Sequence, residues 1–144
     1  HLLNVSKKRI KESNSDRLKF ERKKLHQFCI VMMNTGLRVD ECMGMDWEDV
    51  QFCEKNNLSE KKRDYIDEIE SNYLKLRVIN SKTGEREGYG LGGSYFGLQN
   101  LMKLYKDNNI KIVGNIWLNQ KSFKEGLNNL LLESGLKNEK RGDR

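Results

Sequence analysis

Apolar side chains recur at helical spacing in the first third of the chain. Within residues 16–34, four of them fall at i, i+3, i+4 and i+7, which is the pattern of one buried face of an α-helix. They are Leu25, Phe28, Cys29 and Met32. Asp16 is expected to cap the N-terminus of this helix, and Gly36 suits the left-handed conformation that ends one. A second apolar stripe starts at Val39, so the sequence predicts two helices that meet at a glycine corner.

The pattern changes to that of strands in the middle of the chain. Residues 73–79 alternate and are rich in β-forming side chains. Turn-forming residues follow at 81–84, so residues 85–91 are expected to return as an antiparallel partner strand. Residues 54–72, directly before this hairpin, are a charged insertion. The sequence allows two predictions for it, a short amphipathic helix or a solvated loop.

The last third of the chain returns to helical spacing. Ser94 is expected to cap a helix, whose apolar face consists of Leu98, Leu101, Met102 and Tyr105. Residues 110–118 are a short apolar run, for which a strand and a buried loop are both open. A last helix is predicted at 122–134, with Gly135 as its C-terminal stop. It would bury Phe123, Leu127, Leu130 and Leu131. The elements together predict an α+β domain that is mostly α-helical and has a small antiparallel β-sheet.

Net charge adds a class of partner to this picture. The chain has 144 residues, of which 27 are basic and 21 acidic, with a net charge of +6 and a pI near 9.2. Such an excess favours phosphate-rich partners, because neutralising phosphates releases counterions. Residues 1–15 are basic and polar and are expected to form a linker that enters a single domain at 16–144.

The three cysteines show no Cys-x-x-Cys spacing. Cys29 and Cys42 lie on predicted apolar helix faces, and Cys53 completes an odd set. We interpret them as reduced residues of a cytoplasmic protein. No apolar run approaches the roughly 20 residues of a membrane span, and no signal peptide is predicted.

Arg38 is the first candidate functional residue, because it lies directly after the glycine corner. With its backbone held by a helix on each side, its guanidinium is suited to bind two phosphate oxygens at once. The alternative is a plain helical hairpin in which Arg38 only pairs with Glu41 at i+3.

The residues around Arg38 resemble the first conserved box of the tyrosine recombinase (phage integrase) family. That box reads Thr-Gly-Leu-Arg, with an acidic residue three places on and a Trp-x-Asp-Val/Ile tail. The corresponding residues here are Thr35–Arg38, Glu41 and Trp47–Val50. The resemblance implies a tyrosine-recombinase-like catalytic core, of which this chain would cover about the first half to two-thirds.

The predicted hairpin carries a second part of the resemblance. The family has a catalytic lysine on such a hairpin, in a Lys-Thr-Gly-x-x-Arg setting. Residues 82–86 of this chain read Lys-Thr-Gly-Glu-Arg, and Lys82 follows Arg38 by forty-four residues. The resemblance therefore implies that Lys82 is catalytic and that Arg38, Lys82 and Arg86 bind DNA. The alternative for Lys82 is an ordinary solvated turn lysine.

Members of this family break and rejoin DNA strands in integration and recombination. A tyrosine hydroxyl attacks a phosphodiester and leaves a 3′-phosphotyrosyl link, which conserves the bond energy, so rejoining needs no ATP, metal or other cofactor. By resemblance, Arg38 stabilises charge on the phosphoryl oxygens, Lys82 protonates the leaving 5′-oxygen, and Glu41 orients Arg38 or its neighbours. The implied partner is double-stranded DNA, bound by a homotetramer of the full-length protein. A phage, prophage or other mobile-element integrase is the expected role.

Two parts of the family's active site have no counterpart in these residues. They are the His-x-x-Arg box and the tyrosine nucleophile that follows it. We therefore expect this fragment to be inactive alone. Two alternatives stay open, namely a non-catalytic DNA-binding relative of the same fold and a protein-interaction module that is basic for unrelated reasons.

Several other residues have structural interpretations. The tyrosines all precede the family's nucleophile position and are expected in the core or at the surface; they are Tyr65, Tyr73, Tyr89, Tyr95 and Tyr105. His26 lacks the helical partner of a metal site and is expected to be a packed or surface histidine. Residues 88–93 satisfy Gly-x-Gly-x-x-Gly, but polar residues precede them, so we interpret them as a flexible loop rather than a dinucleotide site.

Overall fold

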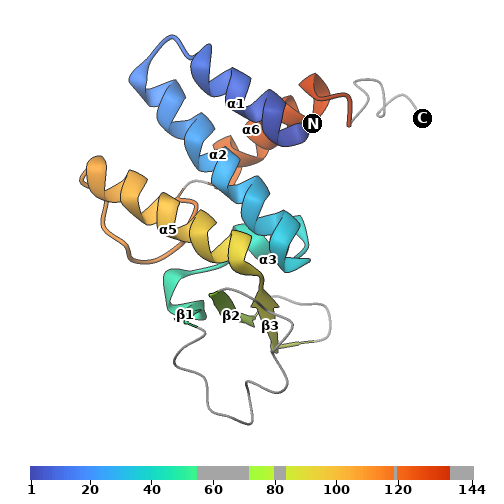
Figure 1. Cartoon of the computed structure of the whole chain (residues 1–144), viewed down its shortest axis with the longest axis vertical. Coiled ribbons are helices and arrows are strands. Elements are labelled where there is room, and N and C mark those ends of the chain that lie inside the picture. The colour runs from blue at the N-terminus through green and yellow to red at the C-terminus, as the bar shows by residue number, and fades with distance from the viewer. Residues whose placement is uncertain (55–71, 80–83, 119, 137–144) are drawn as a thin grey trace.

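The computed structural model describes residues 1–54, 72–79, 84–118 and 120–136. It has a mixed α+β fold that is mostly helical, with one three-stranded antiparallel sheet, as the sequence predicted. The helices gather at one end of the molecule and the sheet lies at the other (Figure 1). The charged insertion at 55–71 and the hairpin turn at 80–83, which includes Lys82, lie outside the described residues.

Helix α2 (Asp16–Thr35) is the central helix, and it ends as the sequence predicted. Gly36 follows it in the left-handed conformation, with φ at 68°, and donates its N–H to the carbonyl oxygen of Met32. The N-terminal cap differs from the prediction. Ser15 rather than Asp16 is the capping residue, since the Ser15 hydroxyl accepts the N–H of Leu18 at 3.1 Å.

Helix α1 (Leu2–Lys11) occupies most of the segment for which a basic linker was predicted. Leu2, Leu3 and Val5 pack against the core. The Arg9 guanidinium forms an ion pair of 2.9 Å with Glu133 of helix α6 (Gln120–Glu133). The segment is therefore packed against two other helices. The prediction of a linker followed from its basic composition and overlooked these apolar side chains.

The predicted hairpin is present. Strand β2 (Tyr73–Val78) pairs with β3 (Arg86–Gly90), and a further strand, β1 (Val50–Cys53), pairs with β2 on its other side. On one face of β2 the side chains of Leu74, Leu76 and Val78 are buried. This face packs against helix α5, so the other face of the sheet carries the polar side chains.

Helix α5 (Gly92–Asp107) begins almost directly after β3, which corrects the interpretation of the glycine-rich segment. Gly88 and Gly90 lie in the strand and Gly93 lies in the first turn of the helix, so the segment is a strand-to-helix junction rather than a loop. Leu91 occupies the N-cap position that was predicted for Ser94. The Ser94 hydroxyl instead donates to the carbonyl oxygen of Leu91 at 2.6 Å.

Helix α5 packs closely along α2, and glycines make this approach possible. A Cβ atom on Gly93 would lie 2.6 Å from the side chain of Asn34, and one on Gly97 would lie 3.2 Å from Ile30. The N–H of Leu91 also donates to the carbonyl oxygen of Asn34 at 3.0 Å. The start of α5 is thereby fixed to the end of α2, beside the glycine corner.

The apolar run at 110–118 is a loop in which Ile116 and Trp117 are buried while Lys111, Val113 and Leu118 are exposed. It holds the exit of helix α3 (Val39–Met43) in place. Trp117 donates its indole N–H to the carbonyl oxygen of Cys42 at 2.8 Å, and the Asn115 amide donates to Met43. The 3₁₀ helix η1 (Trp47–Asp49) follows α3 and leads into β1. Gly135, with φ at 78°, comes shortly after α6, as predicted.

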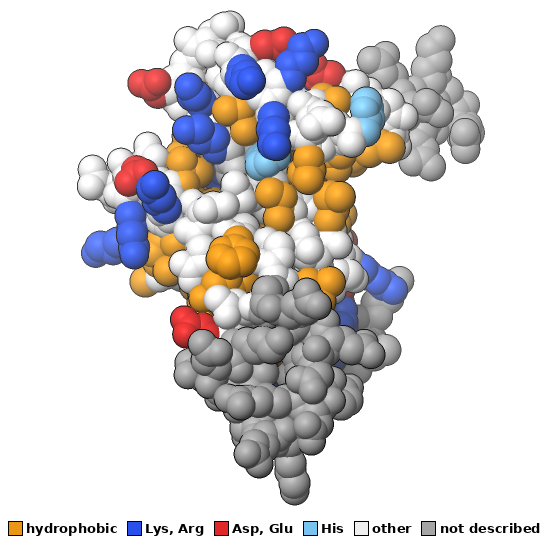
Figure 2. Space-filling view, viewed as in Figure 1, with side chains coloured by type: hydrophobic (Ala, Val, Ile, Leu, Met, Phe, Trp, Pro, Cys, Tyr) orange, Lys and Arg blue, Asp and Glu red, His pale blue; other side chains and the backbone are white. Residues whose placement is uncertain are grey.

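Among the described residues, no helix has both the length and the apolar character needed to cross a membrane. On the face shown in Figure 2, basic side chains lie over α1, α2 and the C-terminal end of α5, with a histidine between them.

Candidate functional site

Arg38 lies at the N-terminal end of α3 with its backbone fixed on both sides. Its N–H donates to the Glu41 carboxylate at 3.0 Å, and its carbonyl oxygen accepts the N–H of Cys42 at 2.9 Å. On the other side, the N–H of Leu37 donates to the Thr35 hydroxyl at 3.3 Å. The Arg38 side chain is exposed. Within the described ranges, no carboxylate lies at ion-pair distance from its guanidinium.

Glu41 is the buried centre of the site, with an exposed fraction of 8 %. Its Oε1 atom accepts the Arg38 N–H and also an N–H of the Arg86 guanidinium at 3.0 Å. The hydrogen bond from the Arg38 backbone is the main reason that the pKa of Glu41 is lowered, and the hydrogen bond and charge of Arg86 add to it. Glu41 therefore stays ionised and holds the Arg38 backbone and the Arg86 side chain together.

Arg86 brings the hairpin to the glycine corner. It pairs across the sheet with Val78, so its side chain leaves β3 on the same face as the buried side chains of β2. At the end of the strand it reaches past the sheet to Glu41, and 41 % of its side chain remains exposed. Two segments forty-eight residues apart in the sequence thus meet at one carboxylate. The position of Lys82 relative to them lies outside the described residues.

The Trp-x-Asp-Val tail, residues 47–50, contributes to the packing of the core and of the sheet. Trp47 is buried in the core, in an edge-on contact with the ring of Tyr105. Asp49 is also buried and accepts two N–H groups of Arg77, from Nε at 3.2 Å and from Nη2 at 2.9 Å. A second contact joins its other oxygen to the N–H of Asp46 at 3.3 Å. The tail therefore connects η1 to strand β2, close to the Glu41 site.

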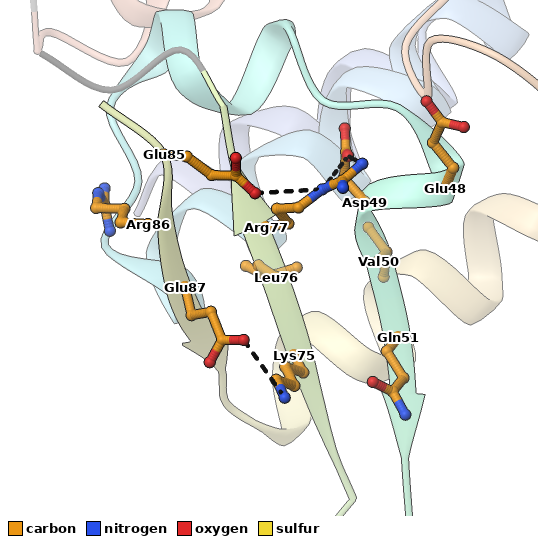
Figure 3. A pocket seen from close by; sticks show the side chains of 10 residues that line it. All are labelled: Glu48, Asp49, Val50, Gln51, Lys75, Leu76, Arg77, Glu85, Arg86 and Glu87. Carbon is orange, nitrogen blue, oxygen red and sulfur yellow. Dashed lines mark hydrogen bonds and ion pairs between the residues drawn. The ribbon is translucent and has the colours of Figure 1, made fainter. Parts of the chain in front are cut away.

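The outer face of the sheet forms a hollow of about 640 Å³ (Figure 3). Residues of η1 and all three strands line it, namely Glu48, Asp49, Val50, Gln51, Lys75, Leu76, Arg77, Glu85, Arg86 and Glu87. Lys75 pairs with Glu87 at 3.5 Å, and Arg77 pairs with Asp49 and, at 4.0 Å, with Glu85. Carboxylates outnumber the cations of this lining, so the hollow does not offer excess positive charge to a phosphate.

Among the described tyrosines Tyr89 is exposed at the surface, and the others are packed, as is His26. Tyr73, Tyr95 and Tyr105 are buried, and burial raises the pKa of Tyr73 to about 12. The Tyr105 hydroxyl donates to the carbonyl oxygen of Ile116. His26 is packed between helices, with its Nδ1 atom 2.9 Å from the hydroxyl of Ser6. Within the part of the chain that the structure describes, no cluster of His, Cys, Asp or Glu side chains could hold a metal ion.

Comparison of the chain with protein-family models, with curated proteins and with solved structures gave no match to any of them. The most specific arrangement among the described residues is the buried carboxylate of Glu41 with an arginine from each of two segments. Sequence reasoning named these three residues, but it did not foresee that one carboxylate would connect them.

Proposed function

We propose that this chain forms part of the active site of a site-specific DNA recombinase of the tyrosine recombinase type. In this proposal Arg38 binds the scissile phosphate during strand cleavage through a 3′-phosphotyrosyl intermediate. The supporting observation is the joint contact of Arg38 and Arg86 with Glu41. It brings the corner segment and the hairpin segment, which the family resemblance had singled out separately, to one place.

The chemistry asks for a fixed cation at the phosphate. Negative charge accumulates on the phosphoryl oxygens as the strand breaks, and a donor that is already oriented stabilises that charge without further reorganisation. The Arg38 backbone is held by Glu41 and by the helical N–H of Cys42, while its guanidinium is exposed. A planar guanidinium in this setting offers two parallel N–H donors to two oxygens of one phosphate.

Arg86 and Lys82 have supporting roles in the proposal. The Arg86 guanidinium keeps one N–H on Glu41 and exposes part of its surface, so it can contact a neighbouring phosphate. Lys82, four residues earlier on the same hairpin, is assigned the protonation of the leaving 5′-oxygen. The tyrosine nucleophile is not assigned to any residue of this chain.

Substitution of Arg38 tests the proposal in the full-length protein. We expect Arg38→Ala to lower the rate of strand cleavage by about 10²–10³. DNA affinity should change by roughly tenfold or less, because one phosphate contact of many is lost. The cleavage rate of Arg38→Lys should lie between those of wild type and Arg38→Ala, since lysine keeps the charge but loses the paired donors. The measurement is the rate of covalent adduct formation on a suicide DNA substrate at saturating protein.

A matched control is Lys111→Ala, which removes an exposed cation outside the site. It should leave the cleavage rate unchanged. Cleavage by the Arg38→Ala protein at the wild-type rate would contradict the assigned role. A wild-type protein that binds duplex DNA and never forms the adduct would identify a non-catalytic DNA-binding relative instead.

A further inference from the structure

The positive charge of the chain is concentrated in its first 24 residues. These residues contain nine basic and three acidic side chains, an excess of six. The whole chain has 27 basic and 21 acidic side chains, so residues 25–144 contain eighteen of each and are balanced. The net charge of +6 therefore belongs to one short stretch, which the candidate recombinase site does not include.

The fold places this stretch at the end of the molecule that is farthest from the sheet (Figure 1). It forms helix α1 and the first half of α2. Some of its cations are used internally, such as Lys24, which is buried and paired with Glu21 at 3.0 Å. Others are exposed and, among the described residues, have no carboxylate at ion-pair distance. These are Lys7, Lys11, Arg17, Lys19 and Lys23.

A groove of about 350 Å³ lies between α2 and α5, next to the end of α1. It is lined by Ile10, Lys23, His26, Gln27, Asn100, Lys103, Leu104 and Asp107. Lys23 stands on the α2 side and Lys103 on the α5 side, and both are exposed and, among the described side chains, unpaired. The side-chain amides of Gln27 and Asn100 add neutral hydrogen-bonding groups. Asp107 is the one carboxylate in this lining.

We propose that this groove and the flanking lysines of α1 and α2 bind the phosphate backbone of duplex DNA, as a second contact area away from Arg38. Lys7 and Lys11 repeat at i, i+4 on α1, and Lys19 and Lys23 do the same on α2. Such pairs lie on the same side of a helix. Rows of cations that continue beyond the groove suit a linear polyanion better than a single phosphate group. The inference rests on the proposed function for the identity of the partner as DNA.

Neutralising the two groove lysines tests the inference. We expect Lys23→Gln/Lys103→Gln to reduce the salt dependence of duplex binding, with the slope of log K against log salt smaller by about 2, since each lost phosphate contact removes roughly 0.9. The matched control is Lys111→Gln/Lys121→Gln, which removes the same charge from exposed positions that do not line the groove. The control should keep the wild-type slope. Fluorescence anisotropy with a labelled duplex over a salt series gives both values.

Two outcomes would overturn the inference. They are an equal change of slope in both double variants and an unchanged slope in the groove variant. Asp107→Asn should act in the opposite direction and strengthen binding several-fold, because it removes the one acidic side chain of the groove.

The two proposals fail separately. If the groove inference is correct and the recombinase proposal is wrong, the groove variant shows the smaller salt slope although wild-type protein forms no covalent adduct. If the recombinase proposal is correct and the groove inference is wrong, Arg38→Ala slows cleavage while the groove variant keeps the wild-type salt slope. All four substituted lysines are exposed, and circular dichroism melts check that each variant is folded.

Discussion

Glu41 shows how one side chain can connect segments that are distant in the sequence. Its spacing from Arg38 predicted contact with that residue, because positions three apart share a side of a helix. The contact that forms uses the backbone N–H of Arg38 rather than its guanidinium. The guanidinium on Glu41 comes from Arg86, forty-five residues later. No periodicity in the sequence reports such a long-range pair, so this half of the site required the structure.

Glu41→Gln should reveal the buried charge through its pH dependence. The amide still accepts the Arg38 N–H but loses the charge that pairs with Arg86, so we expect a loss of about 1–2 kcal/mol in the free energy of unfolding at pH 7. The folded-state pKa of Glu41 lies below its ordinary value of 4.5. The advantage of the carboxylate is therefore present above pH 4.5 and disappears as the pH falls through the folded-state value.

Urea unfolding from pH 7 down to pH 3 measures this difference. The control is Glu125→Gln, which replaces an exposed carboxylate on α6. Its free energy of unfolding should match that of wild type across the range. A difference between Glu41→Gln and wild type that stays constant down to pH 3 would contradict an ionised, hydrogen-bonded Glu41.

At the scale of elements, strong periodicity was informative and short or mixed segments were not. The long apolar face of α2 and the alternation in β2 predicted both elements to within about two residues. Strand β1 has four residues, including Gln51, which is too short for a pattern to emerge. In α1 the apolar residues that pack against the core are few and alternate with lysines, and the fully buried residue is Ser6, so the composition pointed to a linker.

The packing of α1 on α2 has its own pH signature through His26. Burial lowers the pKa of His26, and the charge of Lys7 lowers it further. Above the ordinary value of 6.5 the ring is neutral in both states. As the pH falls through 6.5, the unfolded chain takes up a proton that the folded protein resists, so the folded protein loses stability until the lower folded-state pKa is reached. We expect His26→Gln to reduce this loss between pH 7.5 and 5.

Thermal melts of both proteins over this pH range check the prediction. Lys7→Gln should act in the same direction with a smaller effect, because it removes only the second cause of the shift. Identical pH profiles for His26→Gln and wild type would show that the ring takes up its proton equally easily in both states.

At the scale of the whole molecule, Lys24 connects three parts of the helical end. Its ammonium group is almost fully buried, with an exposed fraction of 1 %. It donates to the carbonyl oxygen of Trp117 at 2.9 Å, pairs with Glu21 and lies 5.0 Å from the ring centre of Phe123 on α6. A lysine in this environment holds the 110–118 loop and α6 against α2. In the sequence it is one more basic residue of a basic stretch.

Lys24→Met keeps most of the length of the side chain and removes the donor. We expect the free energy of unfolding to fall by about 1–3 kcal/mol, because the buried Trp117 carbonyl oxygen loses its hydrogen bond from Lys24. Urea unfolding followed by tryptophan fluorescence measures the loss. Lys19→Met, five residues earlier and exposed, is the matched control and should change stability little. A Lys24→Met protein as stable as wild type would show that packing alone retains the loop.

The composition predicted a phosphate-rich partner without predicting where positive charge would collect. Near the sheet, ion pairs such as Arg77 with Asp49 and Arg86 with Glu41 neutralise much of the basic charge. These pairs join residues far apart in the chain, so a count of charges treats them as free. The excess remains where the chain is basic over a short local stretch, in α1 and the start of α2.

The glycines of the α2–α5 contact limit how the sequence of this protein can vary. Position 93 borders Asn34 so closely that even alanine would displace it, and a Cβ at position 90 would meet Thr35 at 3.1 Å, whereas one at Gly88 would have no neighbour nearer than 3.8 Å. Because β3 runs almost directly into α5, a methyl group added at this seam would shift the strand that carries Arg86. Descendants of this chain that conserve the geometry around Glu41 would therefore retain glycine at positions 90 and 93 while position 88 drifts.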